Sequence, residues 1–182
     1  MKKPNLSAEE ILQLFDMQPL PVEGGWFTQA YLAEETIAKK SLPERYPAGK
    51  PFGTAILYLL TPDPDCFSAM HVLPTDEIYH FYMGDPVEML QLYPDGRSEI
   101  VYLGHNILAG QKVQYTARRG IWQGSHLKPG GEYALIGTTM APGFTNEDYL
   151  GGERDALIET YPDHADLIRT LTRPEEGLLR MP

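Results

Sequence analysis

Short stretches rich in β-branched, aromatic and aliphatic residues recur through the middle of the chain, and turn residues separate them. The run from Thr54 to Leu60 closes at Thr-Pro-Asp-Pro, and the run from Val87 to Tyr93 closes at Pro-Asp-Gly before Ser98 to Leu103 returns. These runs are short for helices and end in residues that favour turns. Together with similar runs in 67–84, 112–116 and 132–140, they predict an all-β fold of the sandwich or barrel type.

Helical patterns flank this β region at both ends. Ser7 followed by Glu10 has the spacing of a capping box, which predicts a short N-terminal helix. Near the other end, 153–159 and 162–171 have helical character, and Pro162 suits a first helical turn. These patterns predict C-terminal helices.

The chain has the organisation expected of one domain over residues 1–182. We place its β core at about 20–149 and its C-terminal helical extension at about 153–172. The residues from 173 to 182 are expected to form a loose tail. The charged, proline-containing stretch 34–50 is expected to be a surface loop, either functional or a disordered insertion.

Charge and cysteine content limit the partners and the compartment. The formal net charge is -10, with 25 acidic against 15 basic residues, which argues against nucleic acid and anionic membranes as partners. A small anionic ligand stays open, because a few local Arg or Lys residues could bind it. The single cysteine, Cys66, excludes an internal disulfide and suits a reducing cytosol. The sequence has no signal-peptide pattern and no apolar run that could span a bilayer, so we expect a cytoplasmic protein.

The stretch 77–83 alternates with the period of a strand. Glu77, Tyr79 and Phe81 share one face, whereas Ile78 and His80 lie on the other. Both faces are largely apolar, and a buried ionisable side chain is costly without a partner. Glu77 and His80 are therefore either functional residues or polar residues satisfied in the core or at a dimer contact.

The chain resembles the cupin superfamily in two motifs. In the first motif, His71, Glu77 and Gly84 occupy the histidine, glutamate and glycine places, while Leu73 stands at the second histidine place. In the second, the turn 118–120 is followed by Gln123 at the histidine place. Further segments resemble one small family, long catalogued as a domain of unknown function and similar in fold to dTDP-sugar epimerases: 23–27, 58–61, 76–82, 84–86, 120–123 and 141–144.

This resemblance implies a cupin jelly roll, or double-stranded β-helix, and a homodimer; it implies no settled reaction. The chain departs from the family pattern after the glycine pair, where relatives often carry Arg-Glu-Thr-Tyr. Here the segment is Thr28-Gln29-Ala30-Tyr31, so a charged pair is missing. If that pair contacts ligand in relatives, the ligand here differs or is less charged.

Metal-bearing cupins use three histidines and a carboxylate, and the resemblance would place them at 71, 73, 77 and 123. Leucine cannot ligate, and a glutamine amide is a weak ligand for transition metals. Two good ligands rarely hold a catalytic metal, since typical sites supply three. We therefore expect no metal and no other cofactor, and rank a metal-dependent oxygenase or isomerase as the least favoured alternative.

Two metal-free functions remain open, both with a small molecule as the partner. In the first, His71, Glu77 and Tyr79 are catalytic residues of an isomerase or epimerase acting on a sugar-like or carbonyl-containing metabolite, and His71 is its general base. In the second, the same cavity binds a ligand without chemistry. In either case the residues expected to contact the ligand are Gln123, Trp122, His80 and Trp26.

Strand phase predicts that His71, Glu77, Tyr79 and Gln123 line one cavity. Glu77 and Tyr79 share an inward face. The break at 74–76 is expected to return the chain so that the strands carrying His71 and Glu77 lie adjacent. The resemblance brings Gln123 in from the opposite sheet.

Overall fold

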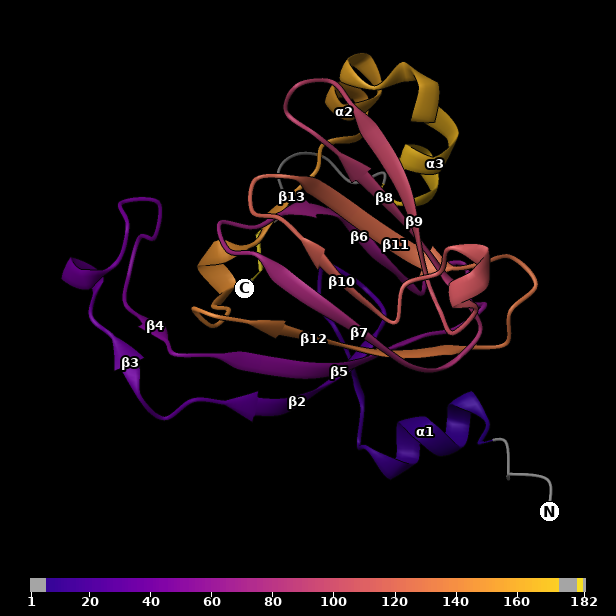
Figure 1. Cartoon of the computed structure of the whole chain (residues 1–182), viewed down its shortest axis with the longest axis horizontal. Helices are drawn as coiled ribbons and strands as arrows, with labels where there is room; N and C mark the ends of the chain where they lie inside the picture. Colours follow the sequence, from indigo (N-terminus) through magenta and orange to yellow (C-terminus); the bar gives the residue numbers. More distant parts are fainter. Residues whose placement is uncertain (1–5, 174–179, 182) are drawn as a thin grey trace.

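The computed structural model describes residues 6–173, Arg180 and Met181, which form two antiparallel β-sheets with helices outside them (Figure 1). The six-stranded sheet has the order β1 (Gln18–Pro19), β2 (Trp26–Leu32), β5 (Thr54–Leu60), β12 (Ala134–Met140), β7 (Glu77–Gly84) and β10 (Gln114–Ala117). The five-stranded sheet has the order β13 (Leu150–Gly151), β6 (Phe67–Val72), β11 (Trp122–Leu127), β8 (Val87–Leu92) and β9 (Ser98–Leu103). Short 3-10 turns lie at η2 (Ile107–Ala109) and η3 (Asn146–Asp148).

Apolar side chains from both sheets form the core between them. Tyr58, Phe81 and Ile136 of the first sheet belong to one buried cluster with Met89 and Leu103 of the second. The predicted all-β, double-sheet architecture is confirmed. The two sheets are open, however, so the word barrel describes them only loosely.

The chain crosses between the sheets at residues 73–76. β6 and β7 were expected to lie side by side, but β6 belongs to the five-stranded sheet and β7 to the six-stranded sheet. Gln123 was expected from the sheet opposite His71; instead β11 pairs with β6, and Gln123 is the register partner of His71. The break at proline therefore carries the chain across the core.

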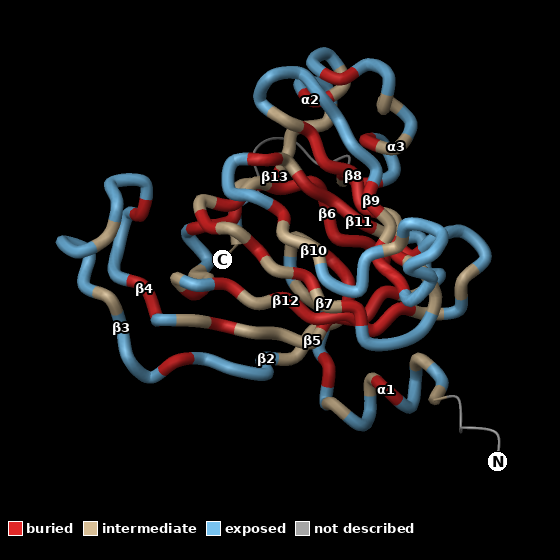
Figure 2. The backbone as a smooth tube through the Cα atoms, in the orientation of Figure 1, coloured by how far each residue is buried: buried red, intermediate tan, exposed pale blue. Residues whose placement is uncertain are grey.

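Helices cover parts of the outer faces, where Figure 2 shows buried segments beneath exposed ones. Helix α1 (Ala8–Leu14) begins at Ser7, whose hydroxyl accepts from the Glu10 N–H at 3.2 Å, so the predicted capping box is confirmed. Ile11 of α1 packs with Leu59 and Leu135. Helices α2 (Arg154–Thr160) and α3 (Ala165–Thr170), joined by η4 (Pro162–His164), pack on the five-stranded sheet. None of the helices in the described ranges is long and apolar enough to cross a membrane.

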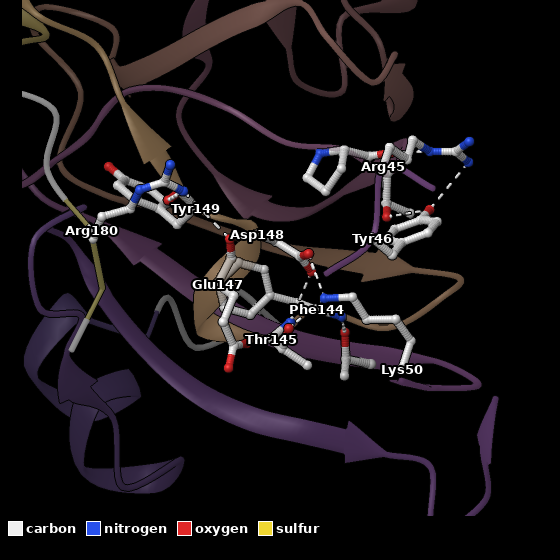
Figure 3. Close-up of polar contacts among 12 residues, drawn as sticks. Arg45, Tyr46, Lys50, Phe144, Thr145, Glu147, Asp148, Tyr149 and Arg180 are labelled. Carbon is white, nitrogen blue, oxygen red and sulfur yellow. Dashed lines mark hydrogen bonds and ion pairs between the residues drawn. The ribbon is translucent and has the colours of Figure 1, made fainter. Parts of the chain in front are cut away.

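The stretch expected to be a surface loop forms an arm that projects beyond β2 and β5 (Figure 1). It contains β3 (Thr36–Ile37), η1 (Lys39–Ser41) and β4 (Lys50–Pro51), and β3 pairs with β4. Figure 3 shows the contacts that hold the end of the arm at β4: buried Lys50 forms an ion pair with buried Asp148 and donates a hydrogen bond to Thr145. In addition, the hydroxyl of Tyr46 bonds that of Thr75 at 2.8 Å. These contacts fix the arm beside the crossover.

The tail is held at both of its described ends. Arg173 Nε donates to the carbonyl of Val22 at 3.1 Å, and Arg180 Nη1 donates to that of Tyr149 at 3.0 Å. The expectation of a loose tail is therefore wrong for these residues. For 174–179 and 182 it lies outside the described part of the chain.

Candidate functional site

A cavity of about 820 Å³ lies between the two sheets. This volume is in the range of small-molecule sites, which is roughly 300–1,000 Å³. Polar side chains from β6, β7, β11 and β12 line the cavity, as do Thr145, Asn146 and Glu147 near η3, and most of the other lining residues are apolar. The polar lining residues discussed below are Glu23, Ser68, His71, Glu77, Tyr79, Ser125 and Thr138.

The two sheets place His71 and Glu77 against each other across this cavity. His71 lies on β6 and Glu77 on β7, and Nε2 of His71 is 4.0 Å from Oε2 of Glu77. Glu77 Oε2 accepts hydrogen bonds from Gln123 Nε2 at 2.6 Å and from the Tyr79 hydroxyl at 3.0 Å. The structure thus brings together the four side chains that strand phase and the motif spacing singled out. Three of them line the cavity, and Gln123 lies behind, bonded to two of the three.

The ring of His71 is held on two sides. Nδ1 donates to the carbonyl of Ala69 at 2.7 Å, so this nitrogen carries a hydrogen. The ring stacks on Tyr149, with 5.0 Å between the ring centroids. The remaining nitrogen, Nε2, lies 3.2 Å from Gln123 Nε2. The orientation of the ring is therefore fixed, and only Nε2 is left for proton exchange.

Electrostatics favour the protonated form of His71. Burial acts to lower its pKa, but the charge of Glu23 and the contact with Glu77 outweigh burial and raise the pKa to about 9. The amide of Gln123, donating to Nε2, would instead fit a neutral ring. One hydrogen bond is worth about 1 kcal/mol, whereas charges 4 Å apart interact by about 4 kcal/mol at an effective dielectric of 20. The charges decide, so the ring of His71 carries both hydrogens.

The partners of His71 keep distinct protonation states. Burial acts to raise the pKa of Glu77, but the contact with His71 outweighs it and lowers the pKa, so Glu77 is ionised. Burial and the charge of Glu77 raise the pKa of Tyr79 well above its usual value, so its hydroxyl remains a donor. At neutral pH the site therefore holds an imidazolium, a carboxylate and a neutral phenol.

Glu23 is a site residue that the sequence reasoning missed. Its carboxylate accepts a hydrogen bond from Ser68 at 2.6 Å, and its backbone carbonyl accepts from the N–H of Ala69 at 2.9 Å. Burial raises the pKa of Glu23, so this half-buried group exchanges its proton nearer to neutrality than an ordinary glutamate. The glycine pair that follows Glu23 was the sequence signal for a close approach of this segment to the sheet. A Cβ on Gly24 would lie 2.4 Å from the carbonyl oxygen of Phe67, so only glycine allows this approach.

Three residues expected to contact ligand lie away from the cavity lining. Trp122 packs on the apolar cluster under the C-terminal helices, and Trp26 packs beside α1. His80 lies 3.1 Å from the hydroxyl of Thr139 and stacks on Tyr82, on the outer face of β7. Strand alternation puts His80 on that face, whereas the two tryptophans are used as apolar packing.

The donor set does not fit the metal site of metal-bearing cupins. His71 and Glu77 are the only classical ligands at the four motif places, with Leu73 and Gln123 at the others. Of these two, His71 uses Nδ1 on a backbone carbonyl. Among the described residues, no group of three or more His, Cys, Asp or Glu side chains is arranged to hold a metal ion. We therefore derive no chemistry through a metal.

Comparison with known proteins gives the same architecture. A family described as Cupin superfamily (DUF985) matches residues 9–150. An uncharacterized protein of Saccharomyces cerevisiae, YML079W, is 31% identical over 117 residues, which are 62% of this chain and 57% of that protein; the match thus spans little more than half of the relative.

Solved structures extend the comparison. Protein SO0799 from Shewanella oneidensis superposes with a TM-score of 0.81 at 26% identity, covering 94% of this chain and all of that one. A hypothetical protein from Leishmania major has a TM-score of 0.78 at 24% identity, with 92% and 99% covered. An oxalate decarboxylase mutant of Bacillus subtilis has a TM-score of 0.51 at 12% identity over 90% of this chain and 39% of its own, a likeness of fold alone. The expected double-stranded β-helix is confirmed.

Proposed function

The chain belongs to the cupin superfamily family DUF985, and on that premise we propose that it binds a small molecule and catalyses a metal-independent isomerisation or epimerisation next to a carbonyl group. The observation that carries this proposal is the hydrogen-bonded group of His71, Glu77, Tyr79 and Gln123 at a cavity of about 820 Å³. Paired groups with pKa values pushed in different directions are typical of proton-transfer sites.

The pKa directions change the roles first expected of these residues. His71 was expected to be the base, but an imidazolium cannot accept a proton. In the proposed reaction His71 is the acid, which gives the Nε2 proton to the carbonyl oxygen of the substrate. Glu23, with its raised pKa, is the base. Glu77 balances the imidazolium charge and holds Gln123 and Tyr79 in place.

The reaction needs no oxidant or other reactant. Glu23 takes a proton from the carbon beside the carbonyl, and the C–H electron pair forms a carbon–carbon double bond. The carbonyl π electrons move to the oxygen, which receives the proton of His71, giving an enol. When Glu23 returns its proton to the former carbonyl carbon and the neighbouring hydroxyl gives its proton to His71, the product is an isomer. When water protonates the original carbon on its other face and the enol proton returns to His71, the product is an epimer, and the proton held by Glu23 neutralises the hydroxide.

Proton exchange with solvent tests this proposal. The protein is incubated in D₂O with aldoses and ketoses, free and phosphorylated, and proton NMR follows the signal of the hydrogen beside the carbonyl. We expect this signal to decay with at least one sugar, and Glu23→Gln to slow the decay at least 100-fold, the usual contribution of a general base. Glu9→Gln, on the exposed face of α1, is the matched control and should exchange at the wild-type rate.

Binding without chemistry is the second candidate. It is favoured by the fact that Glu77, His71 and Tyr79 already bond one another and leave each charge compensated within the protein. In that case a ligand binds, no deuterium enters it, and Glu23→Gln changes affinity alone.

A further inference from the structure

We propose that the ligand is an uncharged amphiphile, with a hydroxyl- or carbonyl-bearing head beside His71 and an apolar part that extends toward β2. This inference rests on the proposed function, that the cavity binds a small molecule, and names the class of that molecule. Four observations carry it: the lack of an unpaired positive charge, the lack of an unpaired negative charge beside His71, buried polar atoms without partners, and the order of residues along the wall.

An anionic head would find no free positive charge. Within the part of the chain that the structure describes, neither Lys nor Arg lines the cavity. Buried Lys50 is paired with Asp148. The charge of His71 is balanced by Glu77, 4.0 Å away, and by Glu23. A phosphate or carboxylate here would lose its hydration without gaining an ion-pair partner, which disfavours its binding.

Beside His71, a cationic head would find no free negative charge; the other lining carboxylate, Glu147, lies on η3 and is exposed to solvent. Glu77 already accepts hydrogen bonds from Gln123 and Tyr79. Glu23 accepts one from Ser68, and its charge also faces the imidazolium of His71. An ammonium group would therefore have to displace these internal partners.

Neutral hydrogen-bonding atoms, in contrast, are available. Ser125 is 1% exposed and lines the cavity, yet its hydroxyl has no partner within the described protein. The side-chain oxygen of Gln123 is also buried and unbonded, but it lies behind the cavity lining. A buried polar atom left unsatisfied is destabilising, so a hydroxyl or carbonyl group of a ligand that bonds Ser125 would stabilise this part of the wall.

The register of the six-stranded sheet leads from the polar group at Tyr79 toward β2. Tyr79 of β7 pairs with Thr138 of β12, and Thr138 pairs with Ile56 of β5. Ile56 in turn pairs with Gln29 of β2, and Phe27 and Leu32 of β2 also line the cavity. A ligand whose head lies at His71 and Tyr79 thus has its other part against aliphatic and aromatic side chains. Gln29 on β2 adds no charge, and the carboxylate of Glu147, which also lines the cavity, is exposed to solvent.

The test compares four probes that vary the head and the tail. Octyl β-D-glucoside carries a neutral head and an apolar tail; octyl phosphate and octylammonium keep the tail but replace the sugar with a smaller, charged head; methyl β-D-glucoside keeps the sugar and removes most of the tail. Binding to the full chain is measured by calorimetry below micelle-forming concentrations. We expect octyl glucoside to bind at least tenfold more tightly than each of the other three, because burying an unpaired charge is unfavourable and the octyl chain buries apolar surface that the methyl group does not.

A matched pair of variants locates the head. Ser125→Ala should weaken the binding of octyl glucoside by about 3- to 10-fold without lowering the unfolding midpoint, because the folded protein loses no hydrogen bond. Ser41→Ala, on the exposed arm, should leave affinity unchanged. Equal affinity of wild type and Ser125→Ala would overturn the assignment of the head.

The outcomes separate this inference from the proposed function. Equal or tighter binding of octyl phosphate or octylammonium would overturn the uncharged class, while equal binding of methyl glucoside would overturn the amphiphile. Failure of all four probes, with deuterium still entering a sugar, would overturn the inference and leave the proposed reaction standing. Binding of octyl glucoside as expected, with no sugar exchanging deuterium, would support the inference and refute the reaction.

Discussion

Replacing Glu77 with glutamine keeps the shape of the side chain and removes the carboxylate that lies 4.0 Å from Nε2 of His71. Two unit charges at this distance interact by about 4 kcal/mol at an effective dielectric of 20, which corresponds to on the order of three pKa units. Glu23 remains and keeps part of the field. We expect the pKa of His71, about 9 in the wild type, to fall in Glu77→Gln by about one to three units.

The same change alters the pH dependence of stability. The pKa of His71 is higher in the folded state, about 9, than its ordinary value of 6.5. Its protonation therefore stabilises the fold fully below pH 6.5, and this contribution, about 3 kcal/mol, is lost as the pH rises through 9. Glu77, with a lowered pKa, contributes stability that is lost as the pH falls below its usual range. In Glu77→Gln the loss on the alkaline side should be smaller and should end at a lower pH.

Two measurements check this prediction. NMR of histidine ring carbons against pH gives the pKa of His71, and urea unfolding at pH 6 and pH 9.5 gives the change in the free energy of unfolding. The control is Glu88→Gln, which removes a carboxylate 3.3 Å from His126 and should leave His71 unchanged. A wild-type His71 that titrates near 6.5, or a pKa that does not move in Glu77→Gln, would refute the electrostatic reasoning.

Three other predictions concern the rest of the molecule. Lys50→Ala leaves the buried carboxylate of Asp148 unpaired and should lower the free energy of unfolding by about 3–5 kcal/mol in chemical denaturation, whereas a loss under 1 kcal/mol would contradict the burial of this pair. We expect a homodimer, because the outer face of β7 is only partly covered in one chain; a monomeric mass by light scattering at micromolar concentration would count against it. Elemental analysis after purification without a chelator or metal-affinity tag should find no stoichiometric transition metal, and one equivalent of iron, manganese, nickel or zinc would reverse the assignment of His71 and Glu77 to metal-free chemistry.

Local sequence patterns predicted the features that depend on neighbouring residues. The period of two in 77–83 placed Glu77 and Tyr79 on the same inward face, and the structure has Tyr79 donating to Glu77. It also placed His80 on the opposite face, where the structure has it. The capping box at Ser7 needs only the next three residues, and it was found where the sequence placed it.

Features that depend on distant residues could not be predicted in the same way. The break at 74–76 marks the end of a strand, but it does not reveal whether the next strand pairs with the first or crosses to the other sheet. The pairing of Lys50 with Asp148 joins residues 98 positions apart. Glu23 lies in a loop without strand or helix periodicity, and its role depends on Ser68, 45 positions away. Trp122 is of a residue type that often contacts ligands, yet it packs in the apolar cluster under the C-terminal helices. The residues next to Trp122 in the sequence do not reveal this packing.

The most direct test of the cavity as the functional site is a set of intermolecular NOEs between octyl β-D-glucoside and the isotope-labelled protein. The account predicts contacts from the glucosyl protons to the ring of His71 and the β-protons of Ser125, and contacts from the alkyl chain to the methyl groups of Ile56 and Leu32. Contacts confined to residues outside the cavity, or glucosyl contacts at Leu32 with the alkyl chain at His71, would contradict it.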